Sequence, residues 1–270
     1  MNKHLKNIVF FLLFVLLFVC LFFFVRESSR LFTTRIFELP ANLPVGDSAF
    51  LPTSAKGNLH RKKHYFISYS EPDRLSEWVA YELHSGELIK EASRDGKRFE
   101  QDTTIQGGVR YSEYTKSGYD RGHLAPAADM AFSDEAMTES FLMSNVAPQL
   151  PSFNRGIWNK LEGKVRDWAS TGEALYVVTG SCWDSTSAGL KETGIPVPGY
   201  FYKVIFDTNR KSRGMVVFLI PHNDAPRNSL FDYVITVDSL EVLTGIDFFG
   251  QLPDSLENEL ESQVRVRLWK

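Results

Sequence analysis

The stretch SGYDRGHLAPAADM, Ser117 to Met130, holds the densest group of chemically active side chains in this sequence. An acid, a base and an imidazole occur within four residues, as Asp120, Arg121 and His123. Gly122 lies between the base and the imidazole, and we expect the chain to bend there because glycine has no Cβ. A lone histidine is more often structural than catalytic, so the neighbouring segments decide how this stretch is interpreted.

The composition is that of a globular protein with a sizeable core. The chain has 270 residues, of which 43% are hydrophobic and 23% charged, and its formal net charge is -3. Residues 1–30 carry four basic and one acidic side chain, which leaves 26 basic and 32 acidic ones, a net charge of -6, in the rest. A protein that grips nucleic acid by charge alone needs a basic surface. If this chain handles nucleic acid, we expect local contacts and a metal ion rather than a broad basic face.

Several kinds of site are not indicated by the sequence. Cys20 lies in an apolar run and Cys182 is the only other cysteine, so the fold is not expected to use a disulfide. The six histidines form neither an HExxH motif nor a zinc-type spacing with cysteine. The sequence also lacks the GxSxG motif of serine hydrolases and the glycine-rich motifs that cradle nucleotide phosphates.

An apolar run without any charge, Ile8–Val25, follows a short N-terminal tail. As a helix its eighteen residues would be ~27 Å long at ~1.5 Å per residue, close to the thickness of the hydrocarbon core of a bilayer. No Ala-x-Ala cleavage pattern follows the run, so we expect residues 1–30 to form a cytoplasmic tail and an uncleaved membrane anchor. A cleaved signal peptide and a buried core helix are the alternatives. Basic residues lie on both sides of the run, so the positive-inside rule only weakly indicates which end of the segment faces the cytoplasm.

The rest of the chain divides into a linker and one domain. Residues 31–57 contain three prolines and several small polar residues and are predicted to be a linker, so residues 58–270 form the domain. Five segments have the pattern of strands: His64–Ser70, Glu77–Leu83, Ala174–Cys182, Tyr200–Phe206 and Met215–Pro221. Ser133 is a predicted N-cap of a short helix. Strands and helices do not alternate regularly, so we predict an α+β fold with a largely antiparallel central sheet.

A helix with one buried face is predicted within Phe153–Trp168. Its apolar residues recur at spacings of one, three, four and three, namely Ile157, Trp158, Leu161, Val165 and Trp168. Asn154 lies on the same side, and Glu162 follows two turns later near the same face. A carboxamide at the buried end of a helix needs a partner, so Asn154 is either a structural hydrogen-bonding group or a ligand of a hard cation through its carbonyl oxygen. Glu162 could then hold a metal-bound water.

Three segments in this order resemble the DNA/RNA non-specific endonuclease family, which includes endonuclease G. They are DRGHLAPAADM, SNVAPQ and FNRGIWNKLE. The step of nine residues from Asn145 to Asn154 and the step of eight from Asn154 to Glu162 are those of the family. EWVAYEL upstream and LTGIDFF downstream also resemble family segments, so the resemblance extends from about Tyr65 to the C-terminus. It implies a ββα-metal (His-Me finger) nuclease domain.

The resemblance also implies roles for the residues that match. His123 would be the general base that takes a proton from the attacking water. Asn154 would be the only direct protein ligand of one Mg²⁺, for which Mn²⁺ or another divalent cation could substitute. Glu162 would act through a metal-bound water.

Four further residues would support these three. Asn145 would position the site. Asp120 would support the residues that bind the metal without touching the metal itself. Arg98, in the segment RFEQD, matches the upstream phosphate-binding arginine of the family. Arg121 is either structural or a contact to the nucleic-acid backbone, and the sequence favours neither.

These residue types suit phosphodiester hydrolysis. An unperturbed imidazole titrates near ~6.5 and can accept a proton at neutral pH. A cation with a neutral ligand remains a strong Lewis acid, and an arginine can clamp the non-bridging oxygens. Because every contact is to phosphate or metal, we predict cleavage of both DNA and RNA without sequence specificity.

The sequence therefore predicts a membrane-anchored, Mg²⁺-dependent non-specific endonuclease with DNA, RNA and the membrane as partners. Such an enzyme must be kept from its own genome, so we expect an anchor in a bacterial inner membrane and a nuclease domain outside the cytoplasm. A homodimer is common in the family. The alternatives are an inactive nucleic-acid-binding or envelope module on the same fold and a metal phosphodiesterase for small nucleotides.

Overall fold

A computed structural model describes residues 37–40, 43, 46, 48–172, 174–190, 193–209, 211–224 and 229–270. The apolar run Ile8–Val25, and with it the predicted anchor, lies outside the described residues. None of the helices in the described ranges is long and apolar enough to cross a membrane.

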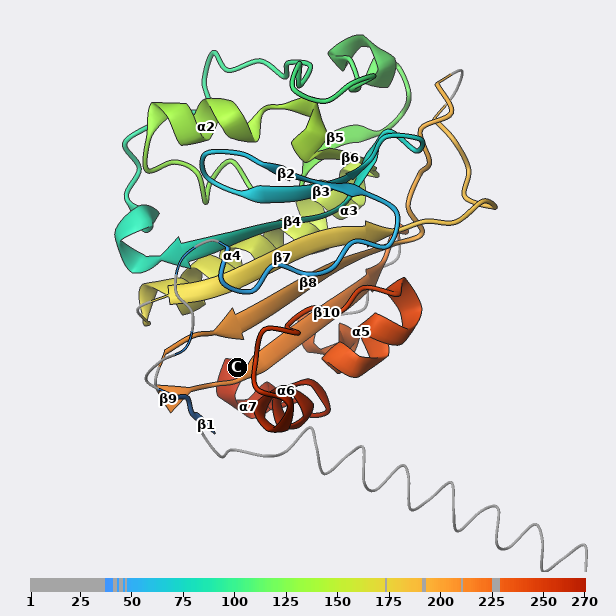
Figure 1. The fold of residues 1–270 in the computed structure, drawn as a ribbon. Coiled ribbons are helices and arrows are strands. Elements are labelled where there is room, and N and C mark those ends of the chain that lie inside the picture. The colour runs from blue at the N-terminus through green and yellow to red at the C-terminus, as the bar shows by residue number, and fades with distance from the viewer. Residues whose placement is uncertain are drawn as a thin grey trace, which may run out of the picture.

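A seven-stranded antiparallel sheet forms the centre of the domain (Figure 1). Its strands, in spatial order, are β11 (Val234–Ile235), β10 (Met215–Pro221), β8 (Tyr200–Asp207), β7 (Ala174–Cys182), β4 (Leu75–His84), β3 (Phe66–Ser70) and β2 (Asn58–Arg61). Two small antiparallel pairs lie outside it, β1 (Phe37–Glu38) with β9 (Lys211–Ser212) and β5 (Asp120–His123) with β6 (Val146–Gln149). The predicted α+β fold is confirmed, and each of the five predicted strands is present.

Helices pack on both faces of this sheet. They are α2 (Asp134–Ser140), α3 (Pro151–Phe153), α4 (Asn159–Ser170), α5 (Val237–Thr244), α6 (Asp254–Glu261) and α7 (Val266–Trp269). Short helical turns occur at η1 (Ser85–Leu88), η2 (Tyr111–Tyr114), η3 (Met143–Asn145), η4 (Asn154–Trp158) and η5 (Leu230–Tyr233). The predicted cap of α2 is confirmed, because the Ser133 hydroxyl accepts a hydrogen bond from the Ala136 backbone N–H at 3.1 Å.

The sheet separates two hydrophobic cores. Successive side chains of a strand point to opposite faces, so β4 contributes Val79 and Tyr81 to one core and Trp78 and Ala80 to the other. The first core contains the apolar residues of α4, and the second contains those of α5 and α6. Helices α4 and α5 therefore lie on opposite faces of the sheet, with α4 behind it in Figure 1.

Part of the predicted linker packs on the domain. Leu39 and Phe50 are buried in the second core. The Phe50 ring meets Tyr176 and Phe206 edge-on, with ring centroids 5.6 and 5.4 Å apart. The packed part of the chain therefore begins before residue 58, where the sequence placed the start of the domain.

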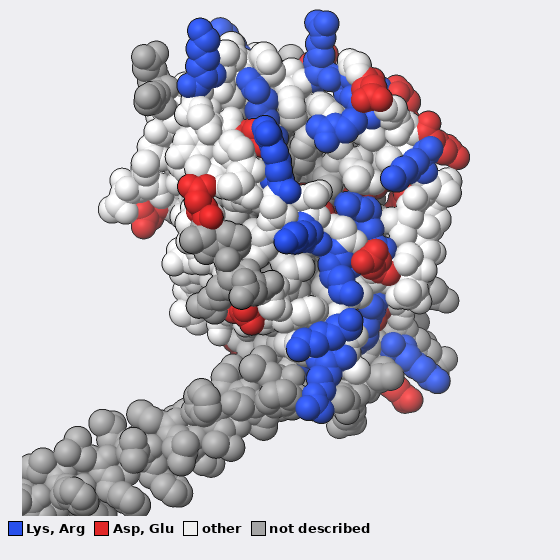
Figure 2. All heavy atoms as spheres, turned by 180° about the vertical axis from the view of Figure 1, so that it is seen from behind, with Lys and Arg blue, Asp and Glu red and all other residues white. Residues whose placement is uncertain are grey.

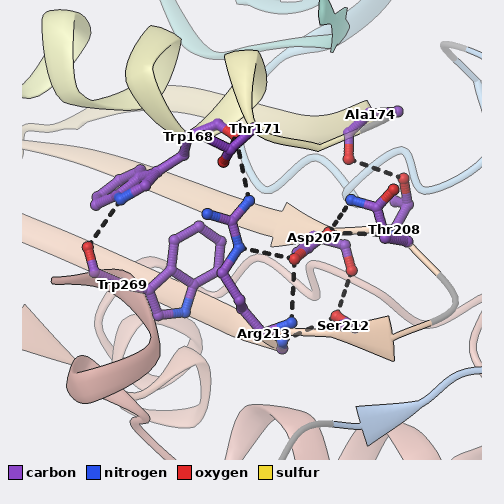
Figure 3. A network of polar contacts seen from close by, with 10 residues as sticks. Trp168, Thr171, Ala174, Asp207, Thr208, Ser212, Arg213 and Trp269 are labelled. Atoms are coloured by element: carbon purple, nitrogen blue, oxygen red, sulfur yellow. Dashed lines mark hydrogen bonds and ion pairs between the residues drawn. The ribbon is translucent and has the colours of Figure 1, made fainter.

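A polar network holds the C-terminal end of α4 (Figure 3). Arg213 Nε donates to the buried carboxylate of Asp207 at 2.8 Å, and Arg213 Nη2 donates to the carbonyl oxygen of Trp168 at 3.3 Å. The Arg213 guanidinium also lies 4.6 Å from the ring centroid of Trp269. Trp168 Nε1 donates to the carbonyl oxygen of Trp269 at 2.8 Å. One end of α4 is thus tied to both β8 and α7, while its other end approaches β5.

Gly122 is needed for close packing, and the predicted bend at this residue was wrong. Gly122 lies within β5, paired with Ala147 of β6, and its φ is not positive. A Cβ on Gly122 would lie 2.1 Å from Oε1 of Gln149, a side chain that is fully buried. Gln149 occupies the space that any other residue at position 122 would need.

We predict that Gly122→Ala destabilises the domain, because the new methyl group and Gln149 cannot both fit. Overpacking of a buried site typically costs ~1–3 kcal/mol, which thermal unfolding of the purified protein would detect. The double variant Gly122→Ala/Gln149→Ala should recover most of this loss. Gly86→Ala is the matched control, since a Cβ there meets nothing within 4 Å. An unchanged melting temperature in Gly122→Ala would contradict the packing explanation.

Candidate active site

A cavity of about 560 Å³ opens where β5, η4 and α4 meet. Five of the residues singled out in the sequence line it: His123, Asp120 and Arg121 from β5, Asn154 from η4 and Glu162 from α4. Segments up to 42 residues apart in the chain thus meet at one site. The structure does not bring the other two candidates, Arg98 and Asn145, to the cavity wall.

A hairpin followed by a helix builds this cavity. The strands β5 and β6 pair antiparallel, with Asp120 opposite Gln149 and His123 opposite Val146, and α3, η4 and α4 follow directly. The arrangement is the ββα unit that the sequence resemblance implies. His123 is the last residue of β5 and so lies on a strand.

The helix that carries Asn154 is not continuous, contrary to the prediction for Phe153–Trp168. A wide π-helical turn, η4, separates α3 from α4, and Gly156 within it has non-helical angles of φ -99° and ψ -109°. Glycine accepts such a conformation most easily, and wide turns of this kind frequently occur at functional sites. The irregular turn leaves Asn154 at the cavity while Ile157 and Trp158 stay buried in the core.

Asp120 fixes the orientation of Asn154. The Asn154 amide nitrogen Nδ2 donates to Asp120 Oδ2 at 3.0 Å. Arg155 donates to the same carboxylate through Nε at 2.8 Å and through Nη2 at 2.7 Å. Partial burial opposes the charged form, but these hydrogen bonds outweigh it and hold the pKa of Asp120 below its usual value. With its nitrogen used by Asp120, the carboxamide can offer its carbonyl oxygen to a cation.

His123 is enclosed by protein on the side away from the cavity. Its ring centroid lies 5.1 Å from that of Phe99 and 5.0 Å from that of Phe141. Its Nε2 atom has no hydrogen-bond partner among the described residues. Burial, with a smaller contribution from the positive charge of Arg94, lowers the pKa of His123 to about 3. The imidazole is therefore neutral at neutral pH and can accept a proton.

Asn145 acts one layer behind His123. Its side chain is fully buried, and its Oδ1 accepts a hydrogen bond from the Ala125 backbone N–H at 2.8 Å. Its Nδ2 donates to the carbonyl oxygens of Ala125, at 2.9 Å, and Ser140, at 2.8 Å. These bonds fix the chain two residues after His123 against the end of α2, a geometry that fits the positioning role expected for Asn145.

Glu162 interacts electrostatically with a buried lysine, Lys203, that the sequence analysis did not single out. Lys203 on β8 is 1% exposed, and its Nζ lies 5.2 Å from the ring centroid of Trp158. Burial raises the pKa of Glu162 and lowers that of Lys203, while the attraction between the two charges opposes both shifts. The sequence could have pointed to Lys203, because it is the one charged residue in the otherwise apolar strand segment YFYKVIF.

Three arginines of the cavity were also missed, namely Arg155, which binds Asp120, and Arg166 and Arg94. Arg166 lies four residues after Glu162, one turn along α4, and its Nη1 donates to Asp129 Oδ1 at 2.7 Å. Arg94 lines the cavity, whereas Arg98, to which the family resemblance pointed, does not. Arg94 and Arg98 lie in the same irregular segment without periodicity, so the sequence could not show which of these two arginines faces the cavity.

Arg121 combines the two readings that the sequence left open. Its guanidinium lies 3.8 Å from the ring centroid of Tyr111, and its Nη2 donates to the Tyr111 carbonyl oxygen at 2.9 Å. The same side chain lines the cavity. Arg121 is thus held by Tyr111 in a position from which it can also meet an anion.

Comparisons with known proteins agree with this geometry. The family model of the DNA/RNA non-specific endonucleases matches residues 48–255. A nuclease of Syncephalastrum racemosum is 34% identical over 230 residues, which cover 77% of this chain and 72% of that protein. A nuclease of Nostoc sp. is 33% identical over 216 residues, which cover 75% of this chain and 77% of that protein.

A solved structure is similar as well. The structure of an EndoG/EndoGI complex, described as giving the mechanism of EndoG inhibition, superposes with a TM-score of 0.69. The two sequences are 27% identical, and the match covers 76% of this chain and 90% of the other. With the residues 48–255 matched by the family model and the ββα unit at the cavity, the chain belongs to the DNA/RNA non-specific endonuclease family and is a hydrolytic nuclease.

Proposed function

We propose that this nuclease is a divalent-metal-dependent endonuclease that uses Mg²⁺ and cleaves DNA and RNA without sequence specificity. The observation that carries the proposal is the meeting of His123, Asn154 and Glu162 at one cavity. A proton acceptor, a neutral oxygen ligand and a carboxylate are the groups that metal-assisted hydrolysis of a phosphodiester needs.

His123 is the proposed general base. Its low pKa keeps the ring neutral before substrate binds, so the base is in its active form over the whole neutral range. The same low pKa makes the protonated ring costly, which would limit proton transfer in the empty cavity. A substrate phosphate brings negative charge next to the ring and raises its pKa, because an opposite charge favours the imidazolium. The base therefore gains strength only when substrate is in place.

The cavity fits a hard cation. Asn154 Oδ1, aimed by the hydrogen bond from Nδ2 to Asp120, and Glu162, through water, would hold the ion. Magnesium usually keeps several waters and takes few protein ligands, and Mn²⁺ could occupy the same oxygen site. When bound, the ion supplies positive charge for the leaving oxygen.

Arginines supply the remaining contacts to phosphate. Arg94, Arg121, Arg155 and Arg166 all line the cavity. Arg155 and Arg166 are held by Asp120 and Asp129, and an arginine fixed in this way keeps further N–H groups for a phosphate. These groups recognise phosphate, which DNA and RNA share, so the proposed lack of specificity follows.

Basic side chains also gather on the outer surface. Figure 2 shows Lys and Arg forming a band across the face seen from behind, the side of the sheet on which α4 lies. The expectation that no broad basic face exists was drawn from a net charge of -6 and was wrong, because an average over the chain does not show clustering. Such a band attracts the phosphate backbone of a long nucleic acid.

We predict that His123→Ala lowers the rate of plasmid nicking by ~10²–10⁴-fold, the usual contribution of a general base. The assay compares the full-length protein with and without EDTA, and a melting curve shows that the variant is folded. His84→Ala, at an exposed histidine outside the cavity, is the matched control and should nick at the wild-type rate. Retention of more than about a tenth of the activity in His123→Ala would contradict the role of base.

We predict that Asn154→Ala raises the Mg²⁺ concentration needed for half-maximal activity and lowers the maximal rate. Asp120→Asn should shift the Mg²⁺ titration in the same direction by a smaller amount, because it weakens the bond that aims the carboxamide. Asn58→Ala, at an exposed asparagine on β2, is the control. The proposal that Asn154 holds the metal fails if its variant titrates with Mg²⁺ like the wild type.

We also propose that residues 1–30 anchor the enzyme in a bacterial inner membrane with the nuclease domain outside the cytoplasm. The support is the charge-free run Ile8–Val25 and the need to keep a non-specific nuclease from the genome. The full-length protein should sediment with membranes and resist extraction by high salt, and protease added to spheroplasts should degrade the domain. Release by salt, or protection from the protease, would count against this arrangement. A homodimer stays a prediction from the family resemblance.

A further inference from the structure

Three acidic side chains converge between α5 and α6, away from the nuclease cavity. Asp238 and Glu241 are three residues apart on α5 and share one side of that helix, and Glu261 is the last residue of α6. One carboxylate oxygen from each of the three lies within 4.8 Å of the others. The cluster therefore joins the two helices that pack on the sheet face opposite α4.

Glu261 is the member of this cluster that needs an explanation. The residue is 5% exposed, and its Oε1 has no hydrogen-bond partner in the part of the chain that the structure describes. An ionised carboxylate is almost never buried unless it is paired, because it loses its hydration. The base four residues later, Arg265, donates to Gln263 at 2.9 Å and lies 3.4 Å from Glu259.

The charges around Glu261 add to the cost of burial. Burial makes the largest contribution to the pKa of Glu261, and the neighbouring negative charges add to it. Together they raise this pKa to about 8; the charges are those of Glu241, Glu257, Asp238 and Asp247. The Phe248 backbone N–H occupies one oxygen of Glu241 at 2.9 Å and leaves the other for the cluster. A group of carboxylates in this arrangement is stable only if positive charge enters it.

We propose that Asp238, Glu241 and Glu261 form a binding site for a second divalent cation, of the Ca²⁺ type, which links α5 to α6. The ligand atoms are all carboxylate oxygens, which hard cations prefer. The three oxygens lie close enough together for one cation to bind all of them, and Ca²⁺ accepts a flexible oxygen shell whereas Mg²⁺ demands near-ideal octahedral geometry, so Ca²⁺ is the better candidate. Asp238 is exposed, which lets water complete the coordination shell.

This site has a structural effect rather than a catalytic one. The sheet separates α5 and α6 from α4, so the ion cannot touch a phosphate in the nuclease cavity. It takes the place of the proton that Glu261 otherwise holds and fixes the last turn of α6 against α5. With three protein ligands, one of them exposed, we expect a dissociation constant of ~10⁻⁴–10⁻³ M, the weaker range of protein calcium sites.

Thermal unfolding of the full-length protein in detergent, first stripped with EGTA and then titrated with CaCl₂, tests the proposal. The melting temperature should rise by roughly 5–10 °C once Ca²⁺ is about a hundredfold above its dissociation constant. Glu261→Gln keeps the size of the side chain and cannot ionise, so at about pH 9, above the raised pKa of Glu261, this variant should melt higher than the wild type in EGTA and lose the response to Ca²⁺. Asp238→Asn, at an exposed position, should weaken the response without a change of fold.

Two controls assign the effect to this cluster. Asn154→Ala, which removes the proposed ligand of the catalytic metal, should keep the full response to Ca²⁺. Asp167→Asn, at an exposed acid of α4, should behave like the wild type, and nicking by Glu261→Gln with saturating Mg²⁺ should be unchanged. The proposal is overturned if up to ~10 mM CaCl₂ leaves the wild-type melting temperature unchanged, or if Glu261→Gln responds as the wild type does. It is equally overturned if acidification stabilises the protein and Ca²⁺ does not, because a shared proton then compensates the cluster.

Discussion

The contact on which the site depends is the hydrogen bond from Asn154 to Asp120. It joins a strand of the hairpin to the wide turn before α4, and so sets the distance between His123 and the helix that carries Glu162. Arg155 binds the same carboxylate with two hydrogen bonds and keeps it ionised. Because Asp120 takes the amide nitrogen, the carboxamide is held with its oxygen available, which is the orientation that a cation ligand requires. A single aspartate thereby holds the Asn154 side chain in the orientation that the proposed metal site needs.

The rest of the fold supplies rigidity around this contact. The helix α4 is held at its far end by Arg213, Asp207 and Trp269 and along its length by the core beneath it (Figure 3). Lys203 adds a positive charge below Glu162, which makes it less costly to bury a carboxylate at the floor of the cavity. Behind His123, Asn145 fixes the backbone of the following residues. A site built on a strand and a helix, with a further layer of fixed groups, holds its geometry more accurately than one built on loops.

The distribution of charge explains how an acidic protein can act on nucleic acids. Arginines gather at the cavity and basic side chains form a band on the face in Figure 2, although the chain carries more acids than bases. Part of the acidic excess lies on the other side of the sheet, between α5 and α6, where Glu261 is buried among carboxylates. The two sides thus suit different charges, phosphate on one and a cation on the other. Net charge describes neither surface, because interactions in solution depend on local charge within about a Debye length.

The sequence by itself determined the strands, the cap of α2 and five of the residues that meet at the cavity, since hydrophobic patterns and ordered motifs are local or one-dimensional signals. The roles proposed for these residues came from the resemblance to the family, with which their chemical types agree. Only the tertiary structure decided that Arg94 and not Arg98 faces the cavity, that Lys203 lies under Glu162, and that Gly122 is required by Gln149 rather than by a bend. It also decided that His123 has a pKa far below that of a free imidazole. Each of these depends on which atoms approach from distant parts of the chain, and on how much water they exclude, and neither quantity is encoded in spacing along the sequence.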